Sequence, residues 1–104
     1  MFDCLSFYKN LADDTRLKSL LLIAKHQTLC VCDIQTALNL SQPKVSRHLA
    51  DLRKSELVIA ERRGKWMYYQ IHPQLPAWAK QVLALTLENS QQYLADCNSC
   101  CPVQ

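Results

Sequence analysis

The sequence predicts a mainly α-helical fold with one small β-hairpin. Apolar residues recur at helical spacing through the first half of the chain and again after Pro76, whereas β-branched and aromatic residues gather only in residues 57–71, around the single glycine, Gly64. The length of 104 residues, with 49% hydrophobic and 20% charged residues, fits one ordinary globular domain. We expect this domain to span residues 1–95, followed by a cysteine-rich tail over residues 96–104.

The first part of the chain predicts two helices. Asp13 and Asp14 are typical of a helix N-terminus, and Lys25 and His26 supply positive charge at the other end of a leucine-rich segment with helical spacing. Residues 2–12 predict a shorter helix with too little apolar surface to pack on its own chain alone. We therefore expect this first helix to contact a second subunit.

Two short helices joined by a tight turn are predicted next. The first covers residues 33–38 and ends at Asn39, which is suited to the left-handed conformation that terminates helices. Ser41 is a good N-cap for the second, and Pro43 fits its first turn. The buried stripe of this second helix should consist of three residues spaced i, i+4 and i+7, which are Val45, Leu49 and Leu52.

The remaining segments predict a hairpin and a final helix. Residues 57–63 and 65–71 should pair as two strands around Gly64, which gives the hairpin a basic tip. Residues 77–94 predict a long amphipathic helix with Trp78, Val82, Leu85 and Asn89 along one face and Leu83 and Leu87 beside it. Helix, helix, helix-turn-helix, hairpin and helix is the winged helix-turn-helix layout, in which the hairpin is the wing.

Positive charge is concentrated in one quarter of the chain. The net charge is only +3, but residues 41–65 hold seven basic and three acidic side chains. Such a patch is typical of nucleic-acid binding, with a solvated face of mixed charges as the alternative. The second helix of a helix-turn-helix enters the major groove of double-stranded DNA. The candidate DNA-binding residues on that helix and the wing are Ser41, Gln42, Lys44, Ser46, Arg47, His48, Arg62, Arg63 and Lys65.

Six cysteines are the second chemical feature of the sequence. No membrane span or signal peptide is evident, so we expect a cytoplasmic protein whose thiols are free, metal-binding or redox-active. Cys30 and Cys32 are one residue apart, and thiolates select soft, thiophilic ions. Residues i and i+2 of a helix point about 200° apart, so this pair can hold one small ion only in an extended or frayed first turn.

Four motifs follow one another in order along the chain: residues 10–17 (NLADDTRL), 29–34 (LCVCDI), 41–49 (SQPKVSRHL), and 64–66 (GKW) followed by Tyr69. Together they closely resemble the arsenic-responsive repressors of the ArsR/SmtB family over residues 5–80. The resemblance implies a homodimeric bacterial repressor, not an enzyme, that leaves its operator when arsenite or antimonite binds. It also implies a dimer built from residues near 2–12 and 77–94, and a pseudo-palindromic operator.

The same resemblance assigns the inducer As(III) or Sb(III) to the thiolates of Cys30 and Cys32. Gln35 stands where the family often has a third cysteine, so the site must be completed by a ligand from elsewhere or work with two thiolates. The candidates for a third ligand or a second site are Cys4, Cys97, Cys100 and Cys101. Our hypothesis for release is that binding pulls residues 30–32 out of helical geometry, shifts helix 33–38 and displaces the DNA-reading helix.

Three alternatives stay open on the sequence. The same thiols could sense cadmium or lead, or two cysteines could oxidise to release DNA in a thiol-based redox sensor. From another class, a small thiol oxidoreductase could use Cys97 and Cys100. That enzyme is disfavoured because the pair lies at a chain end, without the strand and helix that activate a catalytic thiol.

Overall fold

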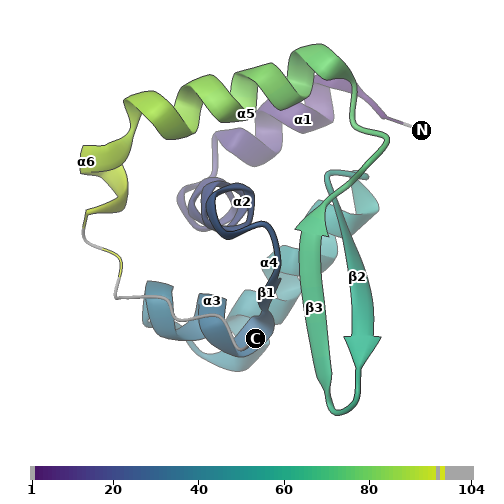
Figure 1. Ribbon diagram of the computed structural model, residues 1–104, viewed down its shortest axis with the longest axis vertical. Helices are drawn as coiled ribbons and strands as arrows, with labels where there is room; N and C mark the ends of the chain where they lie inside the picture. The colour runs from purple at the N-terminus through teal and green to yellow at the C-terminus, as the bar shows by residue number, and fades with distance from the viewer. Residues whose placement is uncertain (1, 96, 98–104) are drawn as a thin grey trace.

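The structure, a computed structural model, describes residues 2–95 and 97. Helix α2 lies at the centre, with α1 and α5 on one side and α3, α4 and the hairpin on the other (Figure 1). In chain order the elements are α1 (Cys4–Leu11), α2 (Asp14–His26), β1 (Leu29–Cys30), α3 (Val31–Leu38), α4 (Gln42–Lys54), β2 (Val58–Arg63), β3 (Trp66–Ile71), α5 (Ala77–Asn89) and α6 (Gln91–Leu94). This arrangement confirms the predicted winged helix-turn-helix.

The residues that end α3, begin α4 and form the buried face of α4 are the ones that the sequence predicts. Asn39 ends α3 with φ 55° and ψ 48°, the predicted left-handed conformation. Ser41 holds the N-cap position of α4, although its side chain makes no capping hydrogen bond. Val45, Leu49 and Leu52 are fully buried, which confirms the predicted stripe and turns the opposite face of α4 outward.

The sheet contains one strand that the sequence did not predict. Strands β2 and β3 pair antiparallel around Gly64, whose φ of +65° favours glycine. The short strand β1 adds to the other edge of β3, with Leu29 opposite Tyr69 and Cys30 opposite Tyr68. Two residues are too few to show a strand periodicity, so only the structure could reveal this pairing.

Helix α3 begins at Val31, two residues earlier than predicted. Its start is set by Cys30, which is extended and belongs to β1. The last predicted helix is interrupted, because α5 ends at Asn89 and Ser90 leaves helical geometry with φ −123° and ψ 31°. Asn and Ser compete with the helix for backbone hydrogen bonds, and the Asn89 amide donates to the carbonyl of Leu85 at 2.8 Å.

The break allows α6 to turn back onto α2. The hydroxyl of Tyr93 donates to Oδ1 of Asp14 at 2.6 Å, and the ammonium of Lys18 lies 5.2 Å from the Tyr93 ring centroid. This hydrogen bond from Tyr93 is the main cause that lowers the pKa of Asp14. Helix α6 is thereby fixed at the N-terminus of α2.

Helix α5 buries only part of its predicted apolar surface, and Val82 of the predicted face is partly buried against the core. Ala79 and Leu83 are buried against the core, whereas Trp78 and Leu85 from the predicted apolar face are 42% and 59% exposed. On the neighbouring helix α1, Leu5 and Tyr8 are also exposed. Among residues 2–95 and 97, no helix has the length and apolar character needed to cross a lipid bilayer.

Candidate functional site

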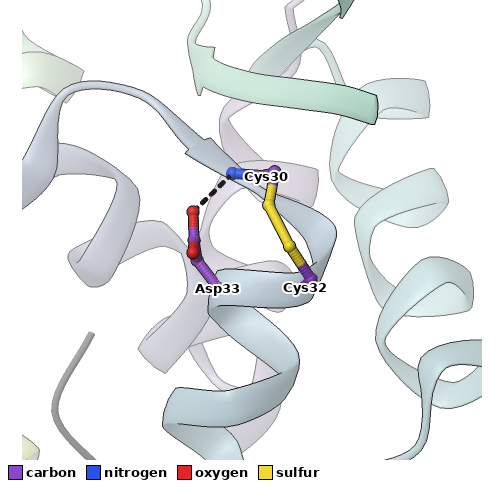
Figure 2. A group of neighbouring side chains, drawn as sticks. All are labelled: Cys30, Cys32 and Asp33. Atoms are coloured by element: carbon purple, nitrogen blue, oxygen red, sulfur yellow. Dashed lines mark hydrogen bonds between the residues drawn. A yellow bond between two sulfur atoms is a disulfide. The ribbon is translucent and has the colours of Figure 1, made fainter. Parts of the chain in front are cut away.

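The sulfur atoms of Cys30 and Cys32 meet at the start of α3, where the structure joins them as a disulfide (Figure 2). Their Cα atoms are 5.4 Å apart, within the range that allows two cysteine sulfurs to meet. The meeting is possible because Cys30 is the extended N-cap, with φ −87° and ψ 164°, while Cys32 is in the first helical turn. Thus both sulfurs face one point without any unwinding of α3.

Asp33 completes this group, although the sequence analysis did not assign it a role. Its Oδ2 accepts a hydrogen bond from the amide of Cys30 at 3.1 Å, the interaction drawn in Figure 2. The two sulfurs and the carboxylate lie within 4.8 Å of one another. The role of Asp33 could have been found from the spacing of a capping box, in which the side chain of the third helical residue accepts a hydrogen bond from the N-cap amide.

Cys30 and Cys32 are held by different parts of the molecule. Cys30 is 1% exposed and pairs with Tyr68 of β3, a strand of the wing. Cys32 is half-buried and belongs to α3, whose Ile34 and Ala37 share the core with the buried stripe of α4. The turn after α3 is tight, since the amide of Leu40 donates to the carbonyl of Gln35 at 3.3 Å. The dithiol therefore lies at the junction of the wing and the helix-turn-helix.

The other cysteines do not join this group within the described residues. Cys4 is exposed on α1, which lies across α2 from α3 (Figure 1). Cys97 is half-buried and lines a cavity of about 110 Å³ with Lys18 and Leu40, beside the turn between α3 and α4. Cys100 and Cys101 lie outside the described residues. A third thiol ligand from any of the four stays a prediction.

The outward face of α4 carries most of the predicted DNA-binding residues. Ser41, Gln42, Lys44 and Arg47 are exposed, and Ser46 is half-buried. The Gln42 amide donates to the Ser46 hydroxyl at 2.7 Å, which links the first two turns of the helix. This face is polar and basic, as contact with a DNA groove requires.

His48 and the wing residues have distinct surroundings. His48 is half-buried, and its Nδ1 lies 3.8 Å from Oδ2 of Asp13, so it faces α2. On the wing, Arg62, Arg63 and Lys65 are exposed. Arg63 donates to Glu61 at 3.0 and 3.2 Å and lies 5.1 Å from the Tyr68 ring. The Arg63 side chain is thus already engaged in contacts within the wing.

An ion-pair network that the sequence analysis missed orients α4. Arg16 of α2 donates to Asp51 of α4 at 3.0 Å and lies 3.8 Å from Asp13, the N-cap of α2. Asp13 also faces His48, so two contacts join the start of α2 to α4. The contacts with Asp51 and His48 join residues far apart in the sequence, and no local pattern signals such contacts.

Known proteins are similar in sequence to most of this chain. The family profile described as bacterial regulatory protein, arsR family, matches residues 13–60. The arsenic resistance transcriptional regulator ArsR2 of Pseudomonas putida is 48% identical over 89 residues, which cover 86% of this chain and 77% of that protein. The arsenical resistance operon repressor of Escherichia coli is 49% identical over 79 residues, which cover 76% of this chain and 68% of that protein.

Solved structures are similar in the same region. Reduced HlyU from Vibrio cholerae aligns with a TM-score of 0.75 at 26% identity, over 85% of this chain and 88% of that one. The antimony-specific transcriptional repressor AntR aligns with a TM-score of 0.69 at 29% identity, over 86% of this chain and 78% of that one. From the identity and coverage of its relatives, this chain belongs to the arsR family of bacterial regulatory proteins.

Proposed function

We propose that this protein is a cytoplasmic transcriptional repressor, not an enzyme, that binds operator DNA as a homodimer and releases it when As(III) or Sb(III) binds Cys30 and Cys32. The observation that carries the proposal is the meeting of the two sulfurs at the junction of wing and helix-turn-helix. The names of relatives that are 47–49% identical, all arsenic resistance regulators or repressors, support the choice of metalloid. The similarity to an antimony-specific repressor supports Sb(III) as a second inducer.

In its dithiol form the pair supplies two thiolates, which are soft ligands suited to a thiophilic centre. The N-terminal end of α3 favours such anions, because unpaired backbone N–H groups and the helix dipole place positive charge there. Asp33 keeps Cys30 in the conformation that faces Cys32. The remaining position on the metalloid would be filled by a further cysteine of either subunit or by a lighter atom such as a water oxygen.

The geometry changes our hypothesis for release. Cys30 is already outside the helix, so unwinding of residues 30–32 is not needed for both sulfurs to reach one ion. An ion bound by both sulfurs instead fixes the distance between them and so displaces one sulfur relative to the other. Because Cys30 is fixed in the sheet, the displacement falls on Cys32 and α3, and through the α3–α4 turn on the reading helix. The wing and α4 then no longer fit the same DNA, which gives the ligand different affinities for the two states.

The DNA contacts follow from the exposed basic surface. Residues of α4 would enter the major groove while Arg62 and Lys65 contact the flanking backbone. We assign the dimer interface to the exposed apolar residues of α1 and α5, which lie side by side (Figure 1). Residues 1–95 would form this DNA-binding and dimerisation domain, and residues 96–104 a tail with further thiols.

Fluorescence anisotropy of a labelled operator tests the proposal. Arsenite should lower the anisotropy of the complex with the reduced wild type, and antimonite should do the same. Cys30→Ser and Cys32→Ser should stay on the DNA at the same arsenite concentration, while a protein truncated after residue 95 should still release. Release by both single variants, with loss on truncation, would instead place the sensor in the tail. A parallel titration with cadmium tests the alternative suggested by relatives named as cadmium resistance regulators.

A further inference from the structure

The disulfide in this structure coexists with a complete DNA-reading arrangement. With Cys30 and Cys32 joined, α3 keeps its cap from Asp33 and α4 keeps its buried stripe. The basic residues of α4 and the wing remain exposed. The joined pair is therefore compatible with the conformation that we expect on DNA.

The two sulfurs lie further apart when they share an ion than when a disulfide joins them. An ion must fit between them and separates them, whereas a covalent bond holds them together. The disulfide also removes both thiolates, which are the ligands that the metalloid needs. Oxidation of the pair is consequently not equivalent to binding of the inducer.

We propose that the Cys30–Cys32 pair is also a site of oxidation by peroxides, whose disulfide retains DNA binding and blocks the metalloid. The retained DNA binding and the block of the metalloid rest on the proposed function, whereas the oxidation of the two thiols does not. Hydrogen peroxide and the metalloid thus compete for the same two sulfurs, and only the metalloid releases DNA.

The half-buried Cys32 is the sulfur open to the oxidant, since Cys30 is 1% exposed. The Cys32 thiolate attacks one oxygen of hydrogen peroxide, the O–O bond breaks, and the released hydroxide takes a proton to leave as water. The resulting sulfenic acid is attacked by the Cys30 thiolate, which forms the S–S bond and expels hydroxide from sulfur, again protonated to water. Two thiols and one peroxide become one disulfide and two waters, so the two electrons lost by sulfur reduce the peroxide.

The test uses the full chain as wild type and as the variant Cys4→Ser/Cys97→Ser/Cys100→Ser/Cys101→Ser, in which only the pair remains. Each is treated with hydrogen peroxide, the excess is removed, and free thiols are counted by alkylation and intact mass. Operator anisotropy is then measured with and without arsenite. The matched control is Cys30→Ser in the same four-serine background, which cannot form the disulfide. If the four-serine variant does not fold, peptide mapping of the oxidised wild type locates the disulfide.

The expected result is loss of both thiols of the pair, an operator Kd within about twofold of the reduced value, and no release by arsenite. Dithiothreitol should restore release. A rise in operator Kd of about tenfold or more on oxidation would overturn the proposal in favour of an oxidant-released repressor. Release of the oxidised protein by arsenite, or survival of both thiols, would overturn it as well. If the reduced protein ignores arsenite, the inducer assignment fails, while the thiol count and the operator affinity still decide the oxidation step.

Discussion

The carboxylate of Asp33 accepts a hydrogen bond from the amide of Cys30 at 3.1 Å, and both residues are at most 8% exposed. This contact fixes the extended conformation of Cys30 that turns its sulfur toward Cys32. Asp33 thus supports the thiol pair through the backbone.

Replacement of Asp33 should weaken both the helix start and the site. Asp33→Ala removes the acceptor and should destabilise the reduced protein by about 1 kcal/mol, as loss of a helix cap does. Asp33→Asn retains an amide oxygen in the same place and should lose less. Urea unfolding gives the stabilities, and arsenite titration should show the same order of affinity. An equal loss in both variants would mean that the charge of Asp33, and not the hydrogen bond, matters.

The contact between Arg16 and Asp51 should position the reading helix. The two side chains are partly exposed, so their coupling in a double-mutant cycle with Arg16→Met and Asp51→Asn should be only about 0.5 kcal/mol. Operator binding should weaken more clearly, because α4 loses one of the two polar contacts that join it to the start of α2. Unchanged operator affinity in both single variants would show that core packing alone orients α4.

The wing should contribute phosphate contacts. Arg62→Ala should weaken operator binding about equally across DNA sequences. It should also reduce the slope of log Kd against log salt concentration by about one unit, because one fewer counterion is released. Lys54→Ala is a suitable control, since Lys54 is exposed at the far end of α4 from the helix start. If Arg62→Ala leaves the slope unchanged, the wing does not touch the DNA backbone.

The exposed apolar face of α5 should form the dimer interface. Leu85 is 59% exposed in the single chain, and a charge there cannot be buried against a second subunit without a large cost. Leu85→Glu should therefore shift the protein from dimer to monomer in sedimentation velocity experiments. The matched control is Glu88→Gln, a change at an exposed residue one turn further along α5. A dimeric Leu85→Glu variant would assign the interface elsewhere.

The sequence was sufficient for the architecture because its signals are local. The stripe of Val45, Leu49 and Leu52 and the left-handed Asn39 are properties of short segments, and the structure confirms them. The pairing of Cys30 with Tyr68 could not be predicted in this way, since it joins residues far apart in the chain.

The details of the site depended on the same kind of contact. The period of a helix alone left residues 30–32 extended or in a frayed first turn, whereas strand pairing makes Cys30 an extended N-cap. The sequence could not separate the core-facing residues of α5 from its exposed apolar residues, because both sets are equally apolar. Only the packing of Ala79 and Leu83 on the core distinguishes the two faces.

The central claim is that the thiolates of Cys30 and Cys32 are the trigger, and arsenic K-edge X-ray absorption tests it most directly. The sample is the reduced variant that retains only this pair, Cys4→Ser/Cys97→Ser/Cys100→Ser/Cys101→Ser, loaded with arsenite, with operator release followed in parallel. We expect two sulfur neighbours per arsenic, a remaining position filled by a lighter atom, and release of the operator. Two results together would contradict the account and assign the sensor to the other cysteines. In the four-serine variant, arsenic would be bound only to oxygen. In Cys30→Ser/Cys32→Ser, arsenic would have three sulfur neighbours and would still release the operator.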